Sequence, residues 1–461
     1  MRTFFTNLLA ATIVVAGCQS IELSPSVTDI DNCTSSLSAS TKVTPTHLAA
    51  YINGYKGIPK TRSADVSIDP ILNGTDTVMY LVNYPEGGWE VLSADLRVPK
   101  VLVMCKGGSM TIEELVSNPA EEDLYGAMGD YISYLHDNPD LEVTDSLGNW
   151  SDVAHQTENM QTREIESWVL IGTTVLEDIV EEQDHLTETK WGQGCYYSSN
   201  TWNISAPYRN SNKLPGQRCI MGCVPVAAAQ MLYYLHYKIG IPDKIYASSV
   251  TEAYIPAGSS SVKLYPQDVT NSNYTNYVWG AMPKEGSSSV TQSEYRYVSS
   301  LMLYLGSLMN ATYTSSLGTS ASKSCIPSAF RNLGIYCIND EVCSFTTIYD
   351  EVVEKKIPVV LSVYYMEDNK RQGHSIVVDG CYDRFRRVQR NYVWNSISGP
   401  KYKTEIDIEN TTMIAINWGY DGDGMYSVGS TIWYDYSITN WAAGGHVFTN
   451  RDLITYGFSA M

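Results

Sequence analysis

Residues 222–240 read GCVPVAAAQMLYYLHYKIG, and the rest of the chain is interpreted outward from this stretch. The early proline, the run of alanines and the closing Gly240 predict a helix from Cys223 to Ile239. A cysteine at that position lies beside unpaired backbone N–H groups and the positive end of the helix dipole. Both lower a thiol pKa and favour the nucleophilic thiolate, and the cysteine's own N–H can donate to an oxyanion. Taken alone, the pattern also fits a buried structural cysteine.

Three further patches carry side chains that a cysteine nucleophile needs. His374 opens a short apolar strand, so its ring can be held firmly while it reaches a neighbouring element. Asn417 and Trp418 end the last strong strand, where they can orient and shield an imidazole. Gln193 lies between two glycines upstream of Cys223, and its amide is a candidate oxyanion donor. Each patch alone also fits a structural part, such as a strand-edge histidine or a turn.

Taken in order, these patches resemble the streptopain family of cysteine peptidases, a papain-like group of bacterial secreted zymogens. The upstream stretch 88–95, GWEVLSAD, and the residues from Pro99 to Leu102 are similar to the inhibitory propeptide domain of that family. The similarity covers most of the chain and rests on an ordered set of motifs: Trp191-Gly192-Gln193-Gly194, Met221-Gly222-Cys223-Val224 with Ala228-Ala229-Gln230, Gly373-His374 with Val377-Val378-Asp379-Gly380, Asn417-Trp418-Gly419, and Ala443-Gly444-Gly445 with Val447-Phe448.

The resemblance implies a cysteine-type endopeptidase that acts on proteins or peptides. Cys223 would attack the scissile carbonyl and His374 would take and return the proton, while Gln193 and the Cys223 N–H stabilise the oxyanion. Trp418 is expected to pack near the histidine, and Asn417 to orient a neighbouring group. The Asn-Ser-Trp order of papain-like enzymes is absent, so the third catalytic position stays open. Asp379 is not expected to fill it, because its spacing from His374 puts the two side chains on opposite strand faces.

We expect an α+β fold, in which a papain-like two-part catalytic domain follows a small α+β propeptide domain. The catalytic domain, at 175–461, has a helical half and an antiparallel sheet half; the propeptide-like domain with its linker, at 46–165, is expected to inhibit it in cis. The predicted elements are helices at 47–52, 120–135, 223–239 and 295–309, and strands at 78–82, 89–92, 98–104, 359–365, 375–379 and 412–418.

Two segments and one cysteine depart from the family pattern or leave alternatives open. The acidic stretch 138–189 fits an exposed linker open to proteolysis and, equally well, an ordinary surface helix. The long interval before Trp418, with its Arg-rich part at 384–390, predicts an inserted hairpin or loop at the edge of the cleft. Cys195 stands where the family tends to have proline, and spacing alone does not decide whether it forms a disulfide with Cys219.

The N-terminus has the pattern of an export signal. Arg2 opens a short positive region, the apolar run from Leu8 to Ala16 is too short to span a bilayer, and small residues lead to Cys18. This resembles the lipobox of bacterial lipoproteins, in which the cysteine thiol receives a lipid. We therefore expect a signal peptide at 1–17, a lipidated Cys18 that anchors the protein to a membrane, and a tether at 18–45. The expected location is extracytoplasmic, on the bacterial outer membrane or cell surface, with release after processing. A plain signal peptide that happens to contain a cysteine is the alternative.

Composition narrows the partners further. The net charge of −19 argues against a nucleic-acid partner, because phosphate binding needs a basic face. Of ten cysteines, nine remain after Cys18, and an odd number in an exported protein suggests at least one free thiol. The cysteine spacing shows no zinc pattern, and Asp421-Gly422-Asp423-Gly424 fits a tight turn better than a calcium loop. No metal and no cofactor are expected.

Two other functions stay open on the sequence alone. The chain fits an inactive scaffold or a peptidase-inhibitor lipoprotein that binds through its propeptide-like domain, although it keeps both Cys223 and His374. It also fits a surface adhesin or glycan-binding lipoprotein, which rests only on the lipobox-like cysteine and the 34 tyrosines.

Overall fold

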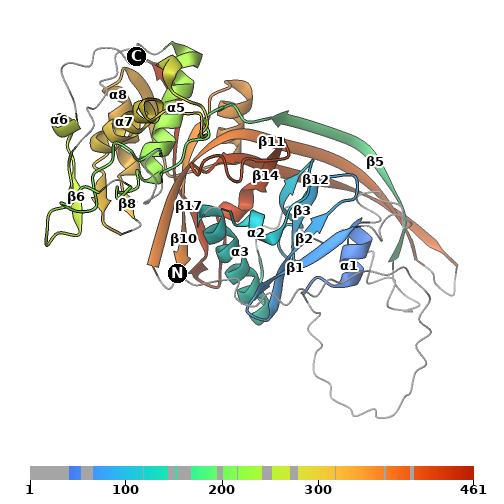
Figure 1. Cartoon of the computed structure of the whole chain (residues 1–461). Coiled ribbons are helices and arrows are strands. Elements are labelled where there is room, and N and C mark those ends of the chain that lie inside the picture. Colours follow the sequence, from blue (N-terminus) through green and yellow to red (C-terminus); the bar gives the residue numbers. More distant parts are fainter. Residues whose placement is uncertain are drawn as a thin grey trace.

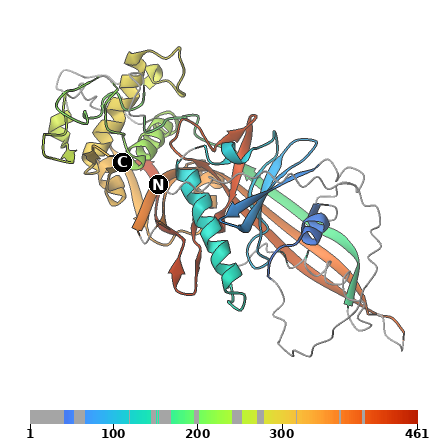
Figure 2. The same cartoon turned by 60° about the horizontal axis from the view of Figure 1, so that its bottom comes forward.

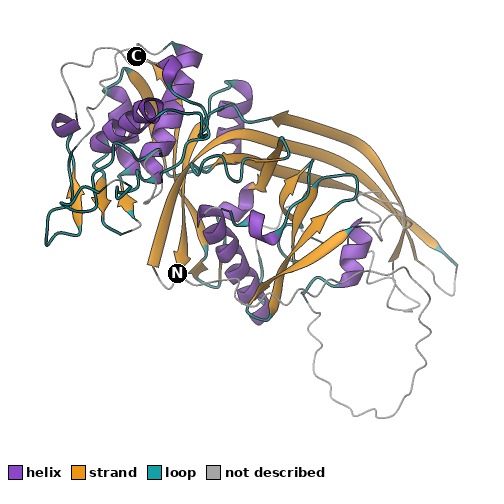
Figure 3. Ribbon diagram, in the orientation of Figure 1, coloured by secondary structure: helices purple, strands orange, loops and turns teal. Residues whose placement is uncertain are grey.

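The computed structural model describes residues 41–52, 66–117, 119–143, 150, 153, 168–194, 201–214, 216–240, 252–269, 279–316, 318–367, 370–394 and 399–461. The expected signal peptide, Cys18, most of the tether and Cys195 lie outside these residues. Figure 3 shows a group of helices at one end, a bent antiparallel sheet in the middle, and a smaller helix-covered sheet beside it. Within the described ranges, no helix has the length and apolar character needed to cross a membrane.

The N-terminal unit is an antiparallel sheet covered by one long helix. The apolar side chains of this helix at Leu124, Met128, Ile132 and Leu135 are buried, at the spacing expected for one helix face. The predicted helices and strands of this unit are confirmed, although the strand expected at 98–104 begins at Val101; strand β1, between α1 and β2, and the short helix α2 were not predicted. Its elements are α1 (Pro45–Ala50), β1 (Ser67–Asn73), β2 (Asp76–Asn83), β3 (Trp89–Ser93), β4 (Val101–Cys105), α2 (Ile112–Leu115) and α3 (Pro119–Asp137).

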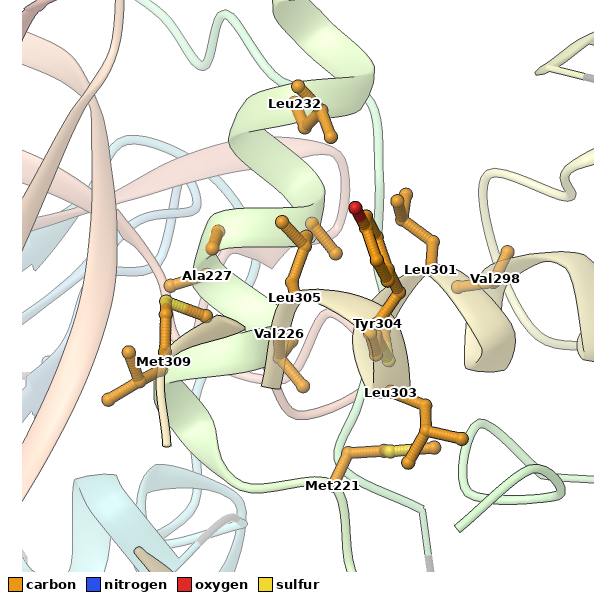
Figure 4. Close-up of a cluster of buried hydrophobic side chains, with 14 of the residues drawn as sticks. Met221, Val226, Ala227, Leu232, Val298, Leu301, Leu303, Tyr304, Leu305 and Met309 are labelled. Atoms are coloured by element: carbon orange, nitrogen blue, oxygen red, sulfur yellow. The ribbon is translucent and has the colours of Figure 1, made fainter. Parts of the chain in front are cut away.

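The helical half is built around α5, which spans Cys223–Ile239 as predicted. Its buried side chains face those of α7, and Figure 4 shows Val226, Ala227 and Leu232 of α5 against Leu301 and Leu305 of α7. The other elements of this half are α6 (Pro266–Val269), α7 (Gln292–Leu308), α8 (Ile326–Arg331), β6 (Ser261–Lys263), β7 (Thr312–Thr314), β8 (Thr319–Ser320), and the short turns η3 (Trp279–Ala281) and η4 (Lys323–Cys325).

The sheet half follows in sequence and carries the three remaining predicted strands. Counted over the described residues, its strands join those of the N-terminal unit in one 12-stranded sheet with the order β1-β2-β3-β4-β14-β12-β11-β10-β17-β9. The other two strands branch from this path, because β13 pairs with β14 and β5 pairs with β11. Its elements are β9 (Ile335–Asp340), α9 (Phe345–Tyr349), η5 (Asp350–Glu354), β10 (Val359–Glu367), β11 (Lys370–Trp394), β12 (Lys401–Asn417), β13 (Tyr426–Ser427), β14 (Ser430–Asp435), η6 (Tyr436–Thr439), β15 (Ala442–Ala443), β16 (His446–Val447) and β17 (Thr449–Ala460).

The N-terminal unit and the sheet half share one hydrophobic core. Strand β4 pairs with β14 through Val103↔Tyr434 and Cys105↔Ile432. A single buried cluster includes side chains of α3, such as Met128, together with side chains of the sheet half, such as Ile414. Because apolar burial is the main stabilising term in a fold, the N-terminal unit is attached to the sheet half by much more than the connecting chain.

A three-stranded arm projects from the sheet half. Strands β11 and β12 form a long hairpin paired from Val377↔Asn417 to Trp394↔Lys401, and β5 (Trp168–Gln183) pairs along the other edge of β11. The predicted insertion is therefore a hairpin. Figure 1 shows it extending away from α5 and past β1–β3, so it does not line the start of that helix. The segment before the peptidase half is neither an open linker nor a helix over these residues, because it forms β5.

Two smaller expectations have direct answers in the structure. The Asp421–Gly424 stretch is a tight turn: Asp421 and Gly422 have φ angles of 55° and 89°, and the Asp421 carboxylate accepts a hydrogen bond from the Trp202 indole. Seven cysteines lie in the part of the chain that the structure describes, and all of them, including Cys219, are free thiols.

Candidate active site

The N-terminus of α5 presents Cys223 without a competing side-chain cap. The residue before it, Gly222, has a φ of 88° and makes no side-chain hydrogen bond to the helix. A Cβ atom at Gly222 would come within 3.1 Å of the Thr319 backbone oxygen, so a larger residue would be strained by both conformation and space. The first N–H groups of the helix therefore remain available to the thiolate and to an oxyanion beside it.

The Cys223 thiol is hydrogen-bonded to the imidazole of His374, 151 positions further along the chain, on strand β11. Burial by itself raises the pKa of Cys223, but the positive charge and hydrogen bond of His374, with backbone hydrogen bonds at Ser375 and Val224, lower it overall. Burial likewise lowers the pKa of His374, and the thiolate and the Trp418 carbonyl raise it overall. The two groups therefore favour a thiolate–imidazolium ion pair.

The second ring nitrogen of His374 is held by main chain. Its Nε2 atom lies 2.9 Å from the backbone oxygen of Trp418, which leaves Nδ1 to face the thiol. The Trp418 ring stacks on the imidazole at 6.3 Å and 22°, and the Tyr420 ring lies 5.6 Å away on a 32° tilt. The group that holds the second ring nitrogen of His374, which the sequence left open, is thus a carbonyl oxygen.

Asn417 contributes to the site through its neighbours. Its amide nitrogen donates to the Gln230 side chain at 2.9 Å and to the Thr189 backbone oxygen at 2.7 Å, and its amide oxygen accepts from the Gly419 N–H at 3.2 Å. Gln230 lies on α5 and also accepts from the Trp191 N–H. Asn417 therefore joins the end of β12 to α5 and to the segment at Thr189, and holds the peptide that carries the Trp418 carbonyl.

Gln193 lies at the start of the same helix and is buried. Its backbone oxygen accepts from the Met221 N–H at 3.0 Å, two residues before Cys223. Burial raises the pKa of Tyr420, and a hydrogen bond from the Gln193 side chain to the Tyr420 hydroxyl partly offsets that rise. Tyr420 follows the predicted Asn-Trp-Gly patch directly, but nothing in its sequence context had indicated a role beside the imidazole.

Asp379 serves a different part of the structure from His374. Its carboxylate is buried and accepts from His185 at 2.6 Å and from the Thr187 N–H at 2.9 Å. Burial lowers the pKa of His185, but the charge and hydrogen bond of Asp379 raise it overall. The expectation from strand alternation, that Asp379 is not the acid of the triad, agrees with this placement.

Comparison with known proteins identifies the family. The sequence model of the Peptidase C10 family matches residues 191–426, more than half of the chain, and the chain belongs to this family. Streptopain of Streptococcus pyogenes is 23% identical over 384 residues, which cover 79% of this chain and 84% of streptopain. A fragment of Prevotella intermedia prointerpain A has a TM-score of 0.47 and 18% identity, over 83% of this chain and 96% of that chain. Active interpain A of the same organism has a TM-score of 0.37 and 20% identity, over 60% of this chain and 96% of that chain.

The protein is therefore a cysteine-type endopeptidase of mixed helix-and-antiparallel-sheet architecture, and its substrates are proteins or peptides. The resemblance to the streptopain family read from the motifs is confirmed. The inactive-scaffold and inhibitor alternative is not favoured, because the chain keeps a thiol and an imidazole in contact with each other at the start of a buried helix.

Proposed function

We propose that Cys223 and His374 are the catalytic pair of this peptidase. The Cys223 thiolate attacks the scissile carbonyl carbon, and the carbonyl electrons move onto oxygen. His374 then gives its Nδ1 proton to the leaving amine, the C–N bond breaks, and a thioester with Cys223 remains. Water attacks this thioester, His374 accepts the water proton, and the acid product leaves as the thiolate reforms. The observation that carries this proposal is the hydrogen bond between Cys223 and His374, with both pKa shifts directed toward the ion pair.

The tetrahedral intermediate needs donors for its oxyanion, and we assign that role to the Cys223 N–H and the Gln193 side chain. The support is positional, because the Gln193 backbone is fixed to Met221 at the helix start. Trp418 shields the imidazole with its ring and orients it with its backbone oxygen. Asn417 is a positioning residue in this scheme, since its hydrogen bonds reach neighbouring groups.

We further propose that the N-terminal unit, predicted at 46–165, keeps the enzyme latent as a zymogen. Helix α3 packs against β10, β15 and β17, which lie beside His374 and beside the loop at Gly444-Gly445. Figure 2 shows this helix crossing that side of the sheet. On α3, the Tyr131 ring stacks on Trp441 at 4.6 Å, and the Tyr134 ring lies 5.2 Å from His446. Helix α3 thus covers the part of the sheet half that a substrate must approach.

Processing is proposed to cut the chain before Trp168, so that β5 stays with the mature peptidase. Strand β5 is paired with β11 from Trp168↔Trp394 to Gln183↔Cys381. Arg384 donates to both carboxylate oxygens of Asp178, at 2.8 and 2.7 Å. A paired, hydrogen-bonded backbone resists proteolysis, which requires an accessible chain. The predicted start of the peptidase domain at 175 lies inside this strand, so the retained part is expected to begin earlier.

For the N-terminus we propose export followed by lipid attachment at Cys18, which would place the zymogen outside the cytoplasm on a membrane surface. The support is the sequence pattern at 1–18, a short positive region, an apolar run and a cysteine after small residues. Growth with a radiolabelled fatty acid tests this directly: the full-length protein should carry label, and Cys18→Ala should not. Equal labelling of both proteins would exclude Cys18 as the anchor.

The catalytic assignment is tested with a thiol-reactive peptide probe on the processed enzyme. We expect one modified cysteine, Cys223, and a loss of labelling in the His374→Ala variant, because the thiolate then loses its stabilising charge. Cys343 is a matched internal control, since burial raises its pKa to about 11 and it should stay unmodified near neutral pH. Labelling of Cys223 that does not depend on His374 would contradict the pair.

A further inference from the structure

An acidic side chain of the N-terminal unit lies against the aromatic groups beside the catalytic pair. The Tyr365 hydroxyl donates a hydrogen bond to the Asp123 carboxylate, although the residues are 242 positions apart in the chain. Tyr365 lies on β10, two residues after Val363, which pairs with His374 on β11. Asp123 lies on α3, the helix that packs on β10. The Asp123 carboxylate at the edge of the site therefore belongs to the part of the chain that processing is proposed to remove.

The negative charge of Asp123 affects the pKa values of His374 and of two tyrosines near it, Tyr365 and Tyr420. Burial raises the pKa of Tyr365 and of Tyr420, and the negative charges of Asp123 and of the Cys223 thiolate raise both further. Burial lowers the pKa of His374, and Asp123 is among the groups that raise it in return. Asp123 thus interacts electrostatically with the imidazolium as well as with two tyrosines, and its carboxylate accepts the hydrogen bond from Tyr365.

The receiving surface has a definite chemistry. Tyr365 comes from β10 and Tyr420 from the bend that follows β12, and both are half-buried. The Tyr420 ring packs beside the His374 ring, and the Tyr420 hydroxyl accepts a hydrogen bond from the Gln193 side chain. Tyr365 therefore offers a hydroxyl donor beside a positive imidazolium, and this combination favours an acceptor oxygen, above all a carboxylate.

We propose that Tyr365 forms a substrate subsite for an acidic side chain. In the uncleaved chain, Asp123 occupies this subsite in place of the acidic side chain of a substrate peptide. This inference rests on the proposed catalytic pair. When the N-terminal unit leaves, the half-buried Tyr365 hydroxyl loses its carboxylate partner. A peptide that carries Asp or Glu at the matching position restores that hydrogen bond, whereas one that carries Ala leaves the hydroxyl without it.

The experiment measures kcat/KM of the processed enzyme on fluorogenic peptides that carry Asp, Asn, Ala or Lys in turn at each position on both sides of the cut. At one position, Asp should exceed Ala by roughly 10- to 100-fold, with Asn between them and Lys lowest, as the strength of hydrogen bonds to charged groups implies. Tyr365→Phe should reduce the ratio of Asp to Ala at that position to about one. Tyr336→Phe, which removes a hydroxyl from an exposed tyrosine on the distant β9, is the matched control and should keep the ratio.

Two results would overturn the subsite: no position at which Asp exceeds Ala, or an Asp preference that survives in Tyr365→Phe. Neither would affect the catalytic assignment, which stands as long as the Ala peptides are cleaved by the processed enzyme and not by a Cys223→Ala protein. A second variant keeps the test decisive if Tyr365→Phe does not fold. In the full chain, Asp123→Asn should raise the rate of self-processing several-fold, because the charged occupant is lost, and an unchanged rate would count against the proposal.

Discussion

The Nε2 atom of His374 and the backbone oxygen of Trp418 lie 2.9 Å apart in a buried position, and this contact fixes the imidazole with its other nitrogen toward Cys223. A carbonyl oxygen is an acceptor at every pH, so it holds the ring without adding a titrating group. Substitution of the Trp418 side chain leaves this oxygen in place, which separates the shielding role of the ring from the orienting role of the main chain.

Trp418→Phe should therefore lower the activity without abolishing it. The variant keeps the carbonyl and an aromatic ring, and loses the indole hydrogen bond to the Tyr434 hydroxyl at 3.2 Å. The loss of one neutral hydrogen bond corresponds to a fall in kcat of about 2- to 10-fold. Steady-state kinetics on a neutral peptide provide the measurement, and a fall above about 1000-fold would mean that the indole itself takes part in catalysis.

Asn417→Ala tests the positioning role. Buried partners on Gln230 and Thr189 lose their hydrogen bonds, so we expect a loss of roughly 1–3 kcal/mol in the free energy of unfolding and a lower kcat. The alkaline limb of the pH–rate profile should keep its midpoint, because His374 still has the Trp418 carbonyl. A midpoint shifted down by a pH unit or more would show that Asn417 acts on the imidazole directly.

Glu121 gives the uncleaved protein an unusual pH response. This carboxyl of α3 is buried, is hydrogen-bonded to Tyr434 and Ser117, and faces Asp423 and Tyr125. Burial and, to a smaller extent, the charge of Asp423 raise its pKa to about 8, although the two hydrogen bonds lower it. Because its pKa is higher in the folded state, its contribution is complete below the unfolded value near 4.5 and is lost as the pH rises through 8. Between pH 6 and 9 this single group should cost about 2.7 kcal/mol of stability, because the carboxyl of the unfolded chain is already ionised there while the folded carboxyl stays protonated up to about pH 8.

The pH response of Glu121 is measured by urea unfolding of the full chain carrying Cys223→Ala, which prevents self-processing. The matched control adds Glu121→Gln, which keeps the side-chain shape and cannot ionise. We expect the loss of stability between pH 6 and 9 to be about 2.7 kcal/mol smaller in the Gln protein. Equal losses in both proteins would mean that Glu121 is not held in its neutral form.

Retention of β5 predicts the composition of the mature enzyme. Mass spectrometry of the processed form should find residues 168–183 still bound to the peptidase half, with the N-terminus before Trp168, because this strand pairs with β11 from end to end apart from two register shifts. Asp178→Ala removes the carboxylate that Arg384 and Arg386 contact, and should make β5 more susceptible to added trypsin. A mature N-terminus after Gln183, with no β5 fragment bound, would contradict this account of processing.

Local patterns were enough to predict α5, the strand carrying His374 and the strand ending in Asn417, because each depends on periodicity and turn residues within one short segment. The group that orients His374 could not be found from side-chain types, since it is a main-chain oxygen. Strand β5 was missed because its acidic residues dominated the interpretation. Its β-branched residues, among them Ile171, Val175, Ile179 and Val180, were the available signal, but their partner strand lies about 200 residues away.

The contacts of Asp123 and Glu121 were also beyond the sequence. Helix α3 was predicted from its apolar spacing, and acidic residues on its other positions are ordinary for a surface helix. Only the packing of α3 on the sheet half turns one of them toward Tyr365 and buries the other against Tyr434. Long-range pairing of this kind is set by tertiary structure, which no local pattern encodes.

The most direct test of the central claim replaces Cys223 with Ala in the full chain and measures casein hydrolysis and self-processing together, with Cys325→Ala, a partly exposed cysteine outside the site, as the control. We predict that Cys223→Ala abolishes both activities while circular dichroism and thermal unfolding stay close to the wild type, and that Cys325→Ala retains both. Hydrolysis of casein by the purified Cys223→Ala protein would contradict the account.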